Sequence, residues 1–111
     1  MKFTEPLKKT WQFRNVYGQG KSKADKNLVV YSLENGTSLN KLGFSISKKA
    51  CGNSVSRNKI KRLIKENYRL LESDLKKGFD FVIIARQPVT QATFYQVKSS
   101  LENIFSRLDL L

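Results

Sequence analysis

The chain contains no histidine, the side chain that most often moves a proton near neutral pH. Histidine-dependent catalytic triads and histidine-ligated metal sites are therefore excluded. A single cysteine, Cys51, rules out an internal disulfide, which fits a reducing compartment. The nine Asp and Glu residues show no paired spacing of the kind that two-metal sites use. We therefore expect no catalytic residue and no bound metal or cofactor in this protein, so that any catalysis comes from a partner.

Long apolar runs are also missing, as are the patterns of signal peptides and lipidation sites. Residues 1–111 are long enough for one domain with a modest core, and no repeat or linker divides them. We expect a single domain that has no membrane partner and is located in the cytoplasm.

Acidic side chains are few beside the basic ones, at 9 against 21, which gives a net charge of +12. Residues 41–69 hold nine of these bases and only one acid, Glu66. A solvated helix face usually mixes both signs in i,i+4 pairs, whereas a face of one sign repels itself until a polyanion binds. This concentration of charge predicts a nucleic-acid-binding protein. An anionic membrane surface is the alternative, disfavoured because the basic segment offers no Trp or Phe for insertion.

The basic segment predicts a helix over residues 54–72, which Asn53 or Ser54 can cap. Projected at 100° per residue, its cations gather on one side, here called the basic face. They are Arg57, Lys59, Lys61, Arg62, Lys65 and Arg69. Ile60, Leu63, Ile64 and Leu71 lie on the other side, which can therefore be buried. Arginine grips phosphate bidentately and Asn58 can contact a base edge or a 2′-hydroxyl, while Lys48 and Lys49 extend the patch upstream.

The remaining pattern predicts an α+β fold in the order α-β-β-α-β-α, with an optional short extra strand. We expect a mixed sheet of about four strands packed by helices. Residues 1–9 are expected to form an extended, basic N-terminal lead. The expected elements are a helix over 10–17, strands over 27–34, 41–47 and 79–85, the basic helix, and a last helix capped by Thr90 or Thr93.

Three aromatic residues form a second candidate site. Phe13 and Tyr17 lie close together on the first predicted helix, and Tyr31 shares one strand face with Val29 and Leu33. They can build a groove on which unpaired bases stack. The alternative is that these side chains belong to the core, and for Phe13 the two interpretations carry equal weight.

The stretch from Gly52 to Arg62, together with Lys48 and Lys49, resembles the central-helix signature of the protein subunit of bacterial ribonuclease P. That signature is close to K-K-x-G-N-A-V-x-R-N-R-I-K-R. Similarity extends to the Phe13 and Tyr17 helix, to Tyr31, and to residues 83–88, and so covers almost the whole chain. Three differences are Ser54 for the usual Ala, Lys59 for the common Arg, and the pair Ala50-Cys51 where one residue is usual.

The resemblance implies an accessory subunit, with no catalytic residues of its own, in an RNA-based endoribonuclease. Its partners are the ribonuclease P RNA, which requires Mg²⁺, and precursor tRNA, whose 5′ leader is removed. The protein is expected to be a monomer in the holoenzyme, with a left-handed β-α-β crossover in its fold. The residues implied to bind the catalytic RNA are Asn53, Arg57, Asn58, Lys59, Lys61, Arg62, Lys65, Lys48 and Lys49. The residues implied to bind the leader are Phe13, Tyr17, Tyr31 and Arg86.

Two other functions use the same basic helix. A structural RNA-binding protein, such as a ribosomal protein or an RNA chaperone, needs that helix but no second surface for unpaired nucleotides. The aromatic groove therefore discriminates between this function and a ribonuclease P subunit. A helix that reads the DNA major groove is a weaker alternative, because no helix-turn-helix pair precedes the basic helix.

Overall fold

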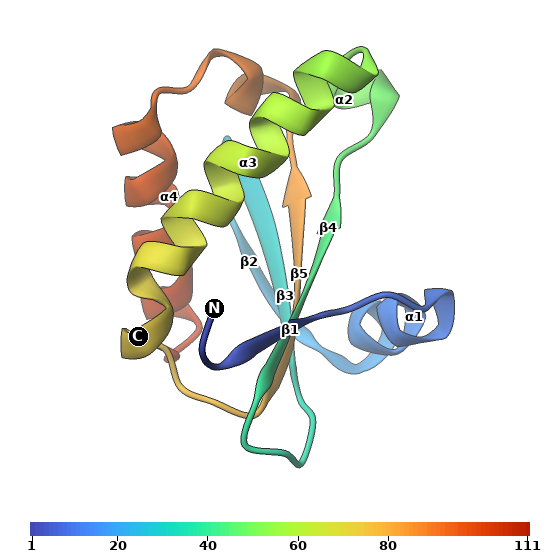
Figure 1. Ribbon diagram of the computed structural model, residues 1–111, viewed down its shortest axis with the longest axis vertical. Coiled ribbons are helices and arrows are strands. Elements are labelled where there is room, and N and C mark those ends of the chain that lie inside the picture. Colours follow the sequence, from blue (N-terminus) through green and yellow to red (C-terminus); the bar gives the residue numbers. More distant parts are fainter.

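The computed structural model describes residues 1–111, which form one mixed sheet with helices on both of its faces (Figure 1). The five strands lie in the order β1-β4-β5-β3-β2. They are β1 (Thr4–Pro6), β2 (Lys21–Ala24), β3 (Leu28–Glu34), β4 (Asn40–Ser45) and β5 (Phe79–Ala85). β1, β4 and β5 are parallel, whereas β3 runs antiparallel to both β5 and β2.

The helices cover the two faces unequally. They are α1 (Thr10–Gln19), α2 (Lys48–Cys51), α3 (Ser54–Leu71) and α4 (Phe94–Arg107), with 3-10 turns at Glu72–Asp74 and Gln87–Gln91. Figure 1 shows α3 and α4 together on one face of the sheet, while α1 lies alone on the other. One face is therefore fully covered and the other only in part.

Strict alternation along β3 and β5 commits each residue to one of these faces. Leu28 and Val30 of β3, with Phe81 and Ile83 of β5, join a main core of 18 buried residues under α3 and α4. The opposite face has a core of three buried residues, Leu7, Val16 and Val82, beneath α1. Because α1 is only 10 residues long, side chains of this face remain partly accessible.

The connection from β4 through α2 and α3 to β5 is a crossover between parallel neighbouring strands. In Figure 1, β1 lies towards the viewer and β2 is more distant, while β4 and β5 both run upward and α3 returns on the left. This path is left-handed, against the usual right-handed preference, as the family resemblance implied.

The N-terminal lead contains an extended segment, as expected, but it also pairs into the sheet, and the expected count of about four strands needs correction to five. Residues 4–6 of the lead form β1, which pairs with β4. The Glu72 carboxylate holds the lead by accepting the backbone N–H groups of Lys2, at 3.1 Å, and Phe3, at 3.2 Å. The other unexpected strand is β2, an edge strand whose Lys-Ser-Lys sequence is exposed. Neither strand buries an apolar side, so neither shows an alternating pattern.

The helix boundaries differ less from expectation. Lys9, not Thr10, is the N-cap of α1, and the helix runs through Gly18 to end at Gln19. Asn53 caps α3, and Thr93 is the one of the two predicted threonines that caps α4. β4 ends two residues early because the Ser47 side chain caps α2 by accepting the N–H of Ala50.

The buried Tyr68 hydroxyl, 2.9 Å from Thr4 Oγ1, predicts an alkaline loss of stability. Burial raises the pKa of Tyr68 to about 12, whereas the phenol of the unfolded chain titrates near about 10. The unfolded state therefore releases this proton first, and stability falls as pH rises from about 10 to 12, by up to about 2–3 kcal/mol. Urea unfolding at pH 8 and pH 11.5 measures this loss. The Tyr68→Phe variant should lose distinctly less than the wild type, and equal losses in both proteins would contradict the assignment to Tyr68.

Candidate nucleic-acid interface

The start of α3 is fixed by a turn and a cap. Gly52 adopts a φ of 85° between α2 and α3, a conformation that residues with a Cβ rarely adopt. The Asn53 side-chain oxygen then accepts the N–H of Ser56 at 2.9 Å. Asn53, predicted to bind RNA, thus uses its carbonyl oxygen for capping, while its side chain stays exposed. The cap fixes where α3 begins, and burial of Ile60 and Ile64 against the core turns the cations of the helix away from it.

The basic face divides into an inner and an outer row. Arg57, Lys61 and Lys65, spaced i, i+4 and i+8, form the inner row and turn towards β4. The Lys61 ammonium lies 5.6 Å from the centre of the Phe44 ring of β4, within the range of a cation–π contact. The outer row consists of Asn58, Lys59 and Arg62, all exposed. Lys61 and Lys65 are exposed although they turn towards β4, and only Arg57 of the inner row is half-buried.

Arg57 sits where the inner row meets the core. The residue is half-buried, and its Nε atom is buried without a hydrogen-bond partner. It lines a hollow of about 250 Å³ with Phe44, Asn58 and Lys61. A buried donor without a partner costs free energy that a bound acceptor can recover, so Arg57 is prepared to bind an anion.

Almost none of these cations forms an ion pair with a carboxylate. The single ion pair in the structure joins Arg69 to Glu66, at 2.7 Å. The N–H hydrogen bond from Arg69 lowers the pKa of Glu66 below its usual value, so this carboxylate stays ionised. Arg69 is thus neutralised within its own helix. The other cations of the basic face have no carboxylate within 4.0 Å, and their charge is available to a polyanion.

Lys48 and Lys49 form the first turn of α2, which packs against α3. Both lysines are exposed, whereas Cys51 of the same turn is buried in the main core. This burial anchors α2 and raises the pKa of the Cys51 thiol, against the smaller opposing effect of the Arg57 charge. The pair Ala50-Cys51 therefore completes a short helical turn that carries the two lysines.

The three predicted aromatic residues meet on the other face of the sheet. The Tyr17 ring lies 6.5 Å from that of Phe13 and 5.1 Å, edge to face, from that of Tyr31. Tyr17 is 40% exposed, and the other two rings are half-buried. We call these three residues the aromatic cluster. Phe13 and Tyr31 also pack against the smaller core beneath α1, so these two rings combine a core contact with partial exposure.

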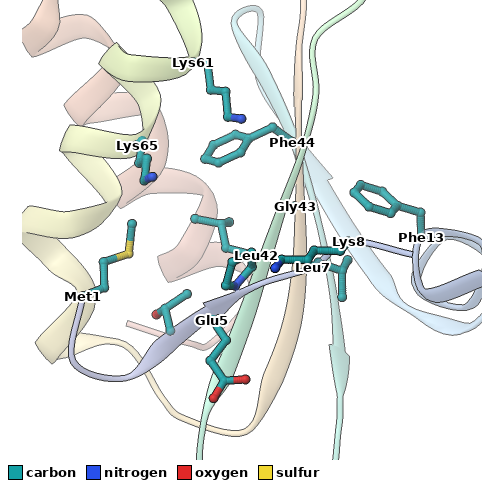
Figure 2. Close-up of a pocket in the computed structure, with 12 residues that line it drawn as sticks. Met1, Glu5, Leu7, Lys8, Phe13, Leu42, Gly43, Phe44, Lys61 and Lys65 are labelled. Carbon is teal, nitrogen blue, oxygen red and sulfur yellow. The ribbon is translucent and has the colours of Figure 1, made fainter. Parts of the chain in front are cut away.

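Gly43 makes the position of Phe13 possible. The Phe13 ring lies over Gly43 of β4, where an added Cβ would come within 2.5 Å of the ring (Figure 2). The same Cβ would lie 3.2 Å from that of Leu7. The sequence alternation placed Gly43 opposite the core side of β4, yet gave no sign that a ring would occupy the space above it.

Arg86, the fourth residue implied to bind the leader, is not in the aromatic cluster. It follows the end of β5, four residues beyond the strand partner of Tyr31, or about 13 Å along the sheet. Its guanidinium donates to the backbone oxygen of Asp25, at 2.8 Å, in the β2–β3 turn. Arg86 is exposed, so it can meet only a ligand that extends well past the cluster.

Phe44 belongs to the interface, although the residue pattern did not predict it there. It alternates with Leu42, so the pattern assigned it to the core side of β4. Its half-buried ring does pack against the main core, and it also lines the hollow beside Arg57 and Lys61. The only available signal was its position near the end of a predicted strand.

The structure has neither a metal-binding cluster nor a membrane-spanning helix. No group of three or more His, Cys, Asp or Glu residues is arranged to hold a metal ion. None of the helices has the length and apolar character needed to cross a membrane.

Comparisons with known proteins agree on one family. The family model described as Ribonuclease P matches residues 1–109. The ribonuclease P protein component of Clostridioides difficile is 44% identical, over 96% of this chain and 94% of its own length. That of Caldanaerobacter subterraneus is 43% identical, over 94% of this chain and 89% of its own.

Solved structures of this family are also similar. The RNase P protein of Staphylococcus aureus superimposes with a TM-score of 0.86 at 39% identity, covering 95% of each chain. The RNase P protein of Thermotoga maritima gives a TM-score of 0.84 at 31% identity, covering 93% of this chain and 96% of its own.

The contact at Gly43 predicts that Gly43→Ala displaces the Phe13 ring and destabilises the protein by about 1–3 kcal/mol. Urea unfolding gives the stability, and the NMR shifts of the Phe13 and Tyr17 rings report the displacement. Gly18→Ala is the matched control, since a Cβ there meets nothing within 4 Å inside α1. That substitution should stabilise the protein by about 0.5–1 kcal/mol. A Gly43→Ala variant with unshifted ring signals would contradict the seating of Phe13 on Gly43.

Proposed function

The chain belongs to the family of ribonuclease P protein components, and on this premise we propose that it binds two RNAs at once. One is the catalytic RNA of ribonuclease P, and the other is the 5′ leader of precursor tRNA. The protein assists removal of the leader, as a cytoplasmic monomer within a ribonucleoprotein. The observation that carries this proposal is the position of β4, with unpaired cations beside one of its faces and accessible aromatic rings beside the other.

Contact with the catalytic RNA is assigned to the basic face and to α2. The residues proposed for it are Asn53, Arg57, Asn58, Lys59, Lys61, Arg62, Lys65, Lys48 and Lys49. Their support is the lack of carboxylate partners and the buried, unsatisfied Nε of Arg57. If about five cations neutralise phosphates, the logarithm of affinity falls with the logarithm of salt concentration at a slope of roughly −4.

Contact with the leader is assigned to the aromatic cluster. Tyr17 is exposed and Tyr31 is half-buried beside it, and stacking on the faces of aromatic rings accepts any base. Phe13 supports Tyr17 from below the surface. Arg86 is proposed to contact the leader's phosphates farther along the sheet, because its side chain lies beyond the cluster.

The chain's own role in the reaction is electrostatic and positional. The proposal has the RNA hold the Mg²⁺ ions that activate hydrolysis, and it assigns no metal or cofactor to the protein. The cations of α3 lower the repulsion between two polyanions, and the rings hold the leader in an extended, unstacked state. No residue of this chain is assigned a proton transfer, since it has no histidine.

Cleavage of precursor tRNA at low Mg²⁺ tests the proposal directly. Protein alone, catalytic RNA alone and the combination are compared under the same conditions. We expect efficient cleavage only by the combination, because the protein's cations replace part of the Mg²⁺ screening. Cleavage by the RNA that is unchanged by added protein would favour a structural RNA-binding protein instead.

The aromatic cluster predicts selectivity for the leader. Tyr31→Ala should weaken binding of leader-bearing precursor tRNA to the holoenzyme by about 1–3 kcal/mol, the contribution of one stacked base. Binding of mature tRNA should be almost unchanged, since it lacks the leader. Equilibrium binding assays with both ligands measure this difference. Tyr95→Ala is the matched control, because Tyr95 is a 74% exposed tyrosine on α4, away from the cluster. Equal losses on the two ligands would rule out the cluster as the leader site.

A further inference from the structure

A hollow of about 440 Å³ opens between β1, β4 and α3, and we call it the edge hollow (Figure 2). Its volume lies in the range of small-molecule sites. Leu42, Gly43 and Phe44 of β4 form its base, and Lys61 and Lys65 of α3 form one side. Of the aromatic cluster, Phe13 lines the hollow, whereas the more accessible Tyr17 and its neighbour Tyr31 do not. The edge hollow is therefore separate from the accessible part of the aromatic cluster.

The edge hollow exists because β1 is short. β1 pairs with Asn40 to Leu42 of β4 and leaves the sheet after the bond from Leu7 N–H to the Leu42 oxygen, 2.9 Å long. The chain then turns towards α1, and residues 43–45 of β4 have no strand partner on that edge. An open edge beside a half-buried aromatic ring is a surface that proteins usually cover.

Three cations converge on this space from opposite sides. Lys61 and Lys65 come from α3, while Lys8 comes from the end of the lead and turns towards Leu42 (Figure 2). None of the three has a carboxylate within 4.0 Å, although Glu5 lines the same hollow. Like charges held close together without a counterion favour the binding of an anion.

The base of the edge hollow is apolar and partly aromatic. The Phe44 ring is half-buried and already has the Lys61 ammonium 5.6 Å from its centre. Leu42 is buried beside it. Apolar, aromatic surface beside unpaired cations matches a ligand with a planar ring and a phosphate, which is the composition of a nucleotide.

We propose that the edge hollow receives one unpaired nucleotide of the catalytic RNA, with its phosphate between Lys8 and Lys61 and its base on the Phe44 ring. This inference rests on the proposed function, since it assumes that the basic face lies against that RNA. Lys61 and Lys65 belong to the basic face and also line the edge hollow. An RNA bound along α3 therefore passes the opening of the edge hollow. The leader, in contrast, is assigned to the aromatic cluster, of which Phe13 lines the edge hollow and Tyr17 and Tyr31 do not.

Site-directed cross-linking identifies the nucleotide. Glu5→Cys places a thiol at the edge hollow without removing a cation, and an azidophenacyl group attached there reacts with nearby RNA. The native Cys51 is buried and its thiol pKa is raised by burial, so it is modified far more slowly. Glu102→Cys, at an exposed glutamate on α4, is the matched control.

The expected result is one dominant cross-link from position 5 to an unpaired nucleotide of the catalytic RNA in the active holoenzyme, absent with the control. A cross-link to the precursor tRNA leader would overturn the assignment to the catalytic RNA. Cross-links spread over paired regions, or the same product from both positions, would overturn the proposed insertion.

Affinity for the catalytic RNA gives a second measurement. We expect Lys8→Ala and Phe44→Leu each to weaken binding about 3- to 10-fold, the effect of losing a single contact. Lys98 is an exposed lysine outside the basic face and the edge hollow. Lys98→Ala should therefore change the affinity less than about 2-fold. Urea unfolding verifies that each variant is folded at the assay temperature. Glu5→Gln should strengthen binding, because it removes the only carboxylate of the edge hollow.

Arg62→Glu separates failure of this inference from failure of the proposed function. If Arg62→Glu weakens binding but Lys8→Ala and Phe44→Leu do not, the edge hollow is not a nucleotide site, and the RNA interface on α3 stands. If none of the three changes affinity, the proposed function itself fails.

Discussion

Parallel pairing of β4 with β5 is the constraint on which the remainder of the structure depends. Parallel neighbours cannot be joined by a tight turn, so the chain must leave the sheet and return to its starting end. That return is α3, which covers the main core with one side and presents cations on the other. Because the crossover is left-handed and β4 lies next to the edge strand, the inner row of cations borders the open part of β4. The topology thus places charge and aromatic side chains together.

The elements with regular apolar spacing could be predicted from the sequence. β3, β5, α3 and α4 each bury one periodic side, and their periods are visible in the residues. β1 and β2 could not be predicted, since both lie at edges and bury almost nothing. Within the interface, the sequence indicated which residues are basic and which are aromatic. Contacts between elements, such as Phe13 over Gly43 or Lys61 over Phe44, depend on strand order, which no local pattern contains.

The protein tolerates an uncompensated charge of +12 by separating it from its core. Glu72 is the only charged residue among the buried ones and no Lys or Arg is buried, so the core forms without desolvating any of the positive charge. Six of the 21 basic residues lie on α3, where a single ion pair relieves part of their repulsion. Arg57, with its unsatisfied Nε, departs from the rule that buried donors are paired. Such departures are expected where a sequence serves binding in addition to folding.

Because the first residues dock against Glu72, the fold cannot be completed until Glu72 has been synthesised. Glu72 lies 70 positions after Lys2 along the chain, and β4, the partner of β1, begins 36 positions after Thr4. During synthesis the N-terminal lead leaves the ribosome first, yet everything that it docks against follows later. Closing so long a loop is slow relative to forming local helices. The lead therefore stays unpaired until β4 and Glu72 have both been synthesised, and until then the edge of β4 that borders its cations is incomplete.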